Sequence, residues 1–150
     1  MRTLDSLIWE LSLDDATRPP SHALICQDPT LDLTRAAIEA GASVTFLDPD
    51  YARCQEAAAL GAAVLGDQRL DAYLAGSSGQ VVALGEMPKS LARLDYLARS
   101  IAGAGFSDVR LVLGGNNKHL SRGMNAVLEE SFTSVAASRG RGKFRCLVAA

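Results

Sequence analysis

Six short apolar segments recur along the chain after residue 21, separated by stretches whose apolar residues have helical spacing. The segments are rich in Val, Leu and Ile and do not alternate with polar residues, as expected for strands buried on both faces of a parallel sheet. Strands that alternate with helices predict a three-layer α/β fold with right-handed crossovers. The predicted strands are Ala23–Cys26, Ser43–Leu47, Ala63–Leu65, Gln80–Leu84, Val109–Leu113 and Phe144–Val148.

The helices between these strands have recognisable ends. Gly41 and Gly61 follow two of them, at the position where glycine most easily takes the left-handed conformation. Asp50 is predicted to cap the second of these helices, and Pro88 to stand in the first turn of a later one. The predicted helices are Thr3–Leu13, Leu31–Ala40, Tyr51–Leu60, one from Pro88 to Gly103 or Gly105, with Leu91, Leu94, Leu97 and Ile101 on the sheet, and Arg122–Ser131.

The length of 150 residues predicts one domain, with a helix and linker over residues 1–20 and the α/β core over residues 21–150. A composition with 48% hydrophobic and 21% charged residues is ordinary for a globular protein. No apolar run is long enough for a membrane span, and acids interrupt the first fifteen residues where a secretory signal needs an apolar stretch. We therefore expect a cytoplasmic protein with no membrane partner.

Cysteine and histidine usage predicts neither a metal site nor nucleophilic catalysis. The three cysteines are widely spaced, without a Cys-x-x-Cys pair, which argues against a zinc site or a disulfide framework. His22 and His119 suggest no set of nucleophile, histidine and acid. No catalytic residue and no metal ligand is predicted.

The carboxyl ends of parallel strands are where ligands bind in such a fold. The loop after the first strand reads Gln27-Asp28-Pro29-Thr30-Leu31-Asp32 and contains no glycine, so it does not match a nucleotide-binding loop. Asp48 and Asp67 follow the second and third strands, where an acid can hold a ribose. They are weak cofactor candidates, and turn and cap roles are the favoured interpretation.

The stretch VVALGEMPKS ends the fourth strand at the same edge. Glu86 in it is a conceivable general base, but its loop holds no histidine and no second carboxylate. The favoured interpretation is that Glu86 stabilises the positive end of the following helix and that Lys89 is solvated.

Charge is divided unevenly along the chain. Residues 1–100 carry a formal charge of −6 and residues 101–150 carry +4. Lys and Arg on glycine-spaced backbone suit phosphate oxygens, so this half predicts an anionic partner that presents phosphates. The alternative is a solvated hairpin turn between two antiparallel edge strands, with basic residues blunting the edge. The candidate RNA-binding residues are Lys118, His119, Arg122, Arg139, Arg141, Lys143 and Arg145.

Three runs resemble a known family: MPKSLARLDYLARSIAG, LVLGGNNKHLSRGMNAVLEESF and VAASRGRGKFRCLVA. In order, they are similar to the amino-terminal domain of bacterial ribosomal RNA guanine-N2 methyltransferases, namely the small-subunit methyltransferase C and large-subunit methyltransferase G groups. The resemblance spans Ala23 to Ala149 and is densest from Pro88 onward. The stretch Lys118-His119-Leu120-Ser121 favours the large-subunit group.

This resemblance implies a Rossmann-like, class I methyltransferase-type sandwich whose mostly parallel sheet ends in an antiparallel carboxyl-terminal edge. Family members carry two such domains in tandem, the first of them degenerate. The catalytic type of domain holds S-adenosylmethionine on a glycine-rich loop after the first strand, and the target amine at Asn-Pro-Pro-aromatic after the fourth. This chain has QDPTLD and GEMPK there. The resemblance thus implies a domain that binds no cofactor, with S-adenosylmethionine held by a catalytic domain after residue 150.

The expected function is to bind ribosomal RNA and to brace that catalytic domain, which makes both of them its partners. A scaffold or dimerisation module without an RNA role is an alternative. A small-ligand Rossmann-like domain that uses Asp48 and Asp67 is another. Formation of a homo-oligomer is compatible with the sequence.

Overall fold

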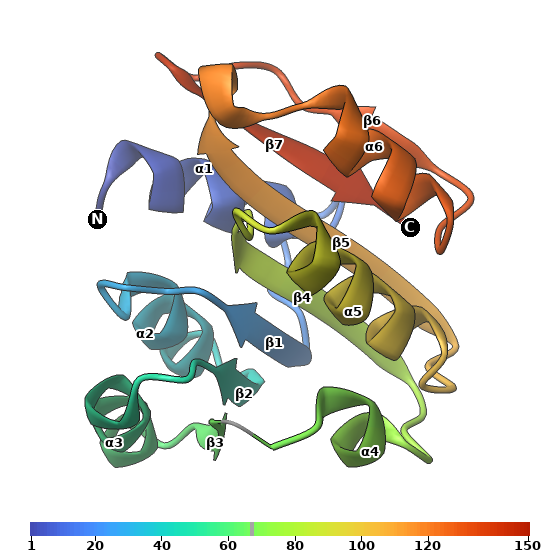
Figure 1. Ribbon diagram of the computed structural model, residues 1–150. Helices are drawn as coiled ribbons and strands as arrows, with labels where there is room; N and C mark the ends of the chain where they lie inside the picture. The colour runs from blue at the N-terminus through green and yellow to red at the C-terminus, as the bar shows by residue number, and fades with distance from the viewer. Residues whose placement is uncertain (67) are drawn as a thin grey trace.

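The computed structural model describes residues 1–66 and 68–150. Its fold is built around one β-sheet. Within these residues seven strands lie in the order β3-β2-β1-β4-β5-β7-β6 (Figure 1). β1 to β5 pair in parallel, whereas β7 pairs antiparallel with β5 and β6. The predicted fold class is confirmed, including the antiparallel carboxyl-terminal edge. The strands are β1 (His22–Cys26), β2 (Ser43–Leu47), β3 (Ala63–Leu65), β4 (Gln80–Glu86), β5 (Asp108–Asn116), β6 (Val135–Ala137) and β7 (Phe144–Ala149).

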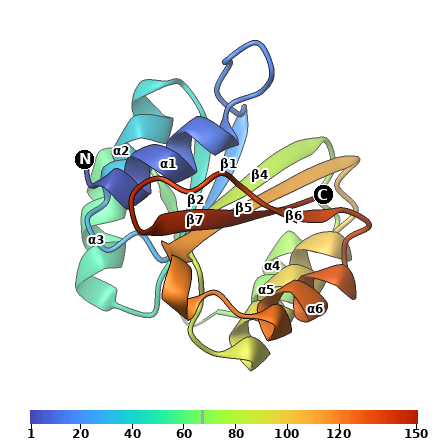
Figure 2. The ribbon, with the colours of Figure 1, turned by 90° about the horizontal axis from the view of Figure 1, so that it is seen from above.

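Helices cover both faces of the sheet. α1, α2 and α3 lie on one face, and α4, α5 and α6 on the other (Figure 2). Among the described residues, none of the helices is long and apolar enough to span a bilayer. The helices are α1 (Thr3–Ser12), α2 (Asp32–Glu39), α3 (Tyr51–Leu60), α4 (Leu70–Leu74), α5 (Leu91–Ala102), the 3₁₀ turn η1 (Asn117–His119) and α6 (Arg122–Glu129).

The core is divided by the sheet into two clusters of buried side chains. Neighbouring residues on one strand belong to opposite clusters: Leu24 packs on the α5 side and Ile25 on the α1 side. The same holds for Leu111 and Val112 on β5. Because both faces of these strands are covered, they read as uninterrupted apolar runs rather than as alternating patterns.

The predicted cap residues are correct for α3, but the predicted start of α5 is wrong. Asp50 accepts a hydrogen bond from the Arg53 backbone N–H and caps α3, and Gly61 ends that helix at φ +109°, both as predicted. The prediction for α5 is wrong at its start. Pro88 precedes the helix, and Ser90 caps it by accepting from the Arg93 N–H at 3.3 Å.

Two errors follow from the later start of α5. The chain is still extended at Met87, whose N–H donates to the Gly114 carbonyl at 2.8 Å, so Glu86 belongs to β4 and not to a helix turn. Leu91 stands in the first turn and is 45% exposed, so it does not pack on the sheet. β6 and α4 were not predicted, because three and five residues are too few to show a period.

Candidate functional site

The carboxyl ends of β1, β2, β4 and β5 meet at one edge of the sheet, because these strands are parallel and adjacent. The antiparallel β7 begins at this same edge, since Asn116 at the end of β5 pairs with Phe144 at the start of β7. The loops after four strands and the hairpin before β7 therefore converge. This edge is the candidate functional site.

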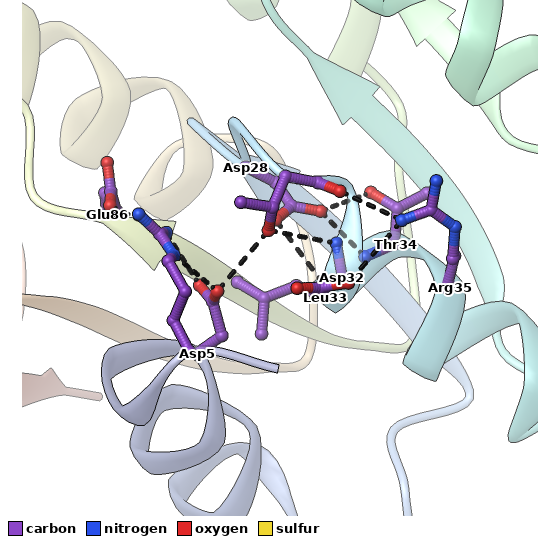
Figure 3. A network of polar contacts seen from close by, with 9 residues as sticks. Asp5, Asp28, Asp32, Leu33, Thr34, Arg35 and Glu86 are labelled. Atoms are coloured by element: carbon purple, nitrogen blue, oxygen red, sulfur yellow. Dashed lines mark hydrogen bonds and ion pairs between the residues drawn. The ribbon is translucent and has the colours of Figure 1, made fainter.

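Asp28, in the loop after β1, is directed into the protein rather than toward a ligand. Its side chain is buried, and one carboxylate oxygen accepts hydrogen bonds from the Thr34 N–H and the Thr34 Oγ1, each at 2.8 Å (Figure 3). The other oxygen accepts from the Leu33 N–H at 3.4 Å. A carboxylate is favourable here because the first N–H groups of α2 lack helical partners. The chain thus fills its own anion-binding position.

Burial raises the pKa of the Asp28 carboxyl above its ordinary value. The hydrogen bonds from Thr34 and Leu33 oppose that shift, and the nearby Asp5 adds to it. Ionising Asp28 therefore costs free energy in the folded state.

A second acid, Asp5 of α1, is also buried at this edge and is neutralised by Arg2. The Arg2 Nε lies 2.8 Å and its Nη2 3.0 Å from the two Asp5 oxygens. The same Nη2 lies 2.9 Å from Oε1 of Glu86 at the end of β4 (Figure 3 labels both acids). Thr30 Oγ1 completes the network by donating to Asp5 at 3.4 Å. The amino-terminal turn of α1 is thereby tied to the loops after β1 and β4.

Gly85 brings the ends of β1 and β4 together. It pairs with Cys26, and a Cβ at position 85 would lie 1.5 Å from the Cys26 carbonyl oxygen. The pairing continues one residue further, where the Glu86 N–H donates to the Gln27 carbonyl at 3.3 Å. Since a carbonyl oxygen occupies the space of a side chain, no residue but glycine fits here, and the strand ends are closed against each other.

The structure describes one of the two acids predicted as weak cofactor candidates. Asp48 is buried, with one oxygen accepting from the Asp50 N–H at 2.8 Å and the other 3.1 Å from the Arg53 guanidinium. Both oxygens are therefore engaged in a turn and an ion pair within their own loop and α3. Asp67 lies outside the described residues.

A cavity of about 600 Å³ opens on the other half of the edge, beyond the ends of β4 and β5. Apolar side chains form most of its wall, and the other side chains that line it include Arg2, Glu86, Lys89 and His119. Its residues come from α1, β4, β5, η1, α6 and β7, so it crosses the edge from one face of the sheet to the other. The remaining lining residues are Leu4, Met87, Pro88, Gly114, Gly115, Asn116, Leu120, Met124 and Phe144.

Four of the predicted RNA-binding residues come together near this cavity. Lys118 and His119 are exposed on η1, and Arg122 is exposed at the first position of α6. Lys143 is exposed before β7, and its carbonyl accepts from the Asn117 N–H at 2.8 Å, which joins the hairpin to η1. Residues far apart in sequence thus place positive charge on one edge.

The other three predicted residues lie on the same hairpin or on β7 and differ in accessibility. Arg139 is exposed. Arg141 forms an ion pair with Glu10 of α1, which raises the pKa of Arg141. Arg145 is partly buried, and its Nε has no hydrogen-bond partner among the described residues. The hairpin alternative was correct in geometry, because β6 and β7 pair antiparallel across this turn.

Sequence reasoning missed Arg2 and Asp5, and it gave Asp28 no role. The spacing Arg2-x-x-Asp5 is a typical helical ion pair and was a usable signal. Asp28 was harder to find, because it caps α2 from outside: the residue directly before the helix is Leu31, in a left-handed conformation at φ +61°.

Cysteine and metal chemistry are not indicated in the part of the chain that the structure describes. It holds no group of His, Cys, Asp and Glu suited to a metal ion. Burial raises the pKa of Cys26 and of Cys146 to about 12, so both are inert thiols at neutral pH.

Comparison with known proteins gives structural matches only. No protein-family profile matches the chain, and neither does any curated protein. The 16S rRNA N2 methyltransferase RsmC of T. thermophilus, solved with AdoMet and guanosine, superposes with a TM-score of 0.63 at 16% identity, over 99% of this chain and 38% of that chain.

Other matches come from further methyltransferases. A TehB-like SAM-dependent methyltransferase from Corynebacterium glutamicum gives a TM-score of 0.62 at 14% identity, covering 90% of this chain and 83% of that one. A ribosomal protein L11 methylase from Lactobacillus delbrueckii gives 0.63 at 21% identity, covering 97% and 78%. The fold is that of SAM-dependent methyltransferases.

Proposed function

We propose that this chain is a non-catalytic methyltransferase-fold domain, which binds ribosomal RNA and braces the catalytic domain of an S-adenosylmethionine-dependent rRNA (guanine-N2) methyltransferase. The observation that carries the proposal is the buried Asp28 carboxylate at the start of α2. It occupies the place where a ligand would meet that helix. Support also comes from the fold and from the resemblance of the second half of the chain.

Electrostatics argues against S-adenosylmethionine at the usual edge position. The methionine part of that molecule carries a carboxylate, and here it would compete with the buried Asp28, which already accepts hydrogen bonds from the first N–H groups of α2.

A calorimetric titration of the chain with S-adenosylmethionine tests the first half of the proposal. We expect no binding heat and no shift of the unfolding temperature at S-adenosylmethionine concentrations up to millimolar. That concentration is on the order of a thousand times the micromolar dissociation constant of a functional site. Binding at micromolar concentration would contradict the proposal.

Exposed positive charge on the η1 and β7 side supports RNA binding. Phosphate contacts give affinity that falls with salt, by about one unit of logarithmic slope for each contact. We expect glutamine at Lys118, Arg122 and Lys143 together to weaken RNA binding and to reduce that slope by about three units. The matched control is Arg69, Arg93 and Arg99 changed to glutamine, a set on α5 and beside α4. An equal loss in both sets would refute a specific surface.

The catalytic domain, which we place after residue 150, and the cytoplasmic location are parts of the same proposal. The sequence encoded downstream tests the first of them. A glycine-rich loop followed by Asn-Pro-Pro-aromatic is expected there, and its absence would overturn the bracing role.

A scaffold or dimerisation role is the second candidate, and it draws on one specific observation. Tyr73, Leu91 and Tyr96 on α4 and α5 are all at least 40% exposed. Exposed apolar side chains of this kind mark contact surfaces. Size-exclusion chromatography separates the two candidates: a dimer that Leu91→Ser dissociates, together with no RNA binding, would favour the scaffold.

A further inference from the structure

The cavity beyond β4 and β5 has the size and wall of a small-ligand site. At about 600 Å³ it lies in the range of such pockets, and it is larger than a single nucleoside requires. Its wall includes Met87 after β4, Leu120 after η1, Met124 of α6 and Phe144 of β7. Enzymes and binders that take a base out of its stack hold it between apolar and aromatic side chains of this kind.

One carboxylate lines the described part of this cavity. Glu86 is the carboxylate among the described lining residues, and its side chain is 30% exposed. Oε1 accepts from Arg2, whereas Oε2 receives no hydrogen bond from a described residue. A carboxylate oxygen that accepts no hydrogen bond from the described residues suits a ligand that presents N–H groups.

Basic residues lie in the cavity wall and directly beside it. Lys89 and His119 line the cavity, Lys118 and Lys143 are the chain neighbours of the lining residues His119 and Phe144, and all four are exposed. Arg2 lines the cavity as well and is paired with Glu86. Exposed basic residues beside an apolar wall suit a nucleotide whose base enters the cavity while its phosphates meet those residues.

We propose that this cavity holds one unstacked RNA base that carries an exocyclic amino group, and that it binds this base without reacting with it. Glu86 accepts from the amino group, which adenine, cytosine and guanine possess and uracil lacks. The inference rests on the proposed RNA-binding function and adds base selection to it. It gives GEMPK a binding role that the sequence interpretation did not assign.

Short oligouridines that differ only at the central position test the proposal. Fluorescence anisotropy of the 150-residue chain is measured with adenine, cytosine, guanine, uracil or no base at that position. We expect an amino-bearing base to bind about tenfold tighter than uracil, and the abasic strand to bind more weakly still. Equal affinity for all five would overturn the proposal.

Glu86→Ala distinguishes recognition of the base by Glu86 from a general repulsion between its carboxylate and the phosphates. If Glu86 only repels phosphates, its removal strengthens binding of every strand alike. If it reads the base, preference for the amino-bearing strands is lost while oligouridine binds no more weakly. A uniform gain with the preference intact would refute the role given to Glu86.

Gly115→Val tests the cavity itself. Gly115 lines it, and a Cβ there would lie 3.5 Å from the Leu120 Cδ2 and 3.8 Å from the Met87 Cβ, which is ordinary contact. Valine should fit the strand, fill part of the cavity and abolish the difference between the base-bearing and abasic strands. Ala63→Val, on the exposed edge strand β3, is the control and should change nothing.

The two proposals fail in distinguishable ways. If the Lys118, Arg122 and Lys143 set lowers the salt slope but neither the central base nor Gly115→Val matters, RNA binding stands and base selection is refuted. If no oligonucleotide binds at all, both are refuted. Should Gly115→Val fail to fold, Gly115→Ala and Glu86→Ala still decide the outcome.

Discussion

The carboxyl edge of the sheet has two halves that contrast sharply. On the β1 and β2 side, Asp28 and Asp48 are buried and both are fully hydrogen-bonded to their own loops and helices. On the β4 and β5 side there is a cavity of about 600 Å³ whose lining residues include Arg2, Glu86 and Lys89. The buried acids of the first half stabilise the fold through their hydrogen bonds, whereas the second half contains an open cavity. The difference shows that one edge of a sheet can be filled by its own side chains on one side and hold a cavity on the other.

Alanine substitutions at two glycines should give the largest difference in stability between the two halves. Gly85→Ala should destabilise the protein by roughly 3 kcal/mol or more, because its Cβ would overlap the Cys26 carbonyl and force β4 away from β1. Gly115→Ala on the open half should change the free energy of unfolding by less than about 0.5 kcal/mol. Urea denaturation measures both. Similar losses for the two variants would refute the contrast.

Asp28→Ala should cost about 1–3 kcal/mol, because it leaves the Thr34 N–H and Oγ1 buried without an acceptor. The same measurement on Glu86→Ala is the comparison from the open half, where the acid is partly exposed, and it should cost less. A neutral Asp28→Ala variant would mean that water enters and that this half is not sealed.

Asp28→Asn should give a smaller, pH-dependent effect. Because burial raises the pKa of Asp28, the folded state keeps a proton that the unfolded chain releases near its ordinary pKa of about 3.9. That stabilising contribution is fully present below the unfolded pKa and is lost as the pH rises through the folded one. The free energy of unfolding of the wild type minus that of the variant should therefore fall above about pH 4.

Asp32→Asn is the control, since it lies at the same helix end but is only partly buried. Its difference from the wild type should show no such decline. A flat or rising difference for Asp28→Asn would mean that hydrogen bonding outweighs burial at this carboxyl.

The smallest effect concerns two basic residues of the β6–β7 hairpin. Lys143→Gln should lower the salt slope of RNA binding by about one unit. Arg141→Gln should lower it less, because Arg141 is engaged by Glu10. Filter-binding titrations at several salt concentrations measure the two slopes, and an equal decrease would show that the ion pair opens on binding.

Much of this architecture was predictable from sequence, and the reasons are local. Six strands were located from their apolar runs, which are buried on both faces in the central strands but not in the edge strand β3. The helix α3 was found at its observed limits because Asp50 and Gly61 mark its ends. Pro88 misled, because a proline also fits the extended chain that precedes a cap. The residues of β6 carry too little pattern to be recognised alone.

The candidate site was less predictable because the residues that form it are far apart in the sequence. That the basic residues share an edge follows from strand direction, but the ion pair of Arg141 with Glu10 joins residues 131 positions apart. The filled position of Asp28 depends on where α2 begins, which no short motif specifies. The cavity is a property of how six elements meet, and no stretch of sequence contains it.

The packing of α1 has a consequence for the order in which the domain assembles. α1 precedes the strands of the sheet in sequence, yet it contacts β4, β5 and β7, and β7 follows the other six described strands. Its apolar face, with Leu4 and Ile8, cannot be fully covered until residues beyond 143 have been synthesised. Pairings between distant segments form slowly, so closure of the sheet by β7 should be the late step of folding.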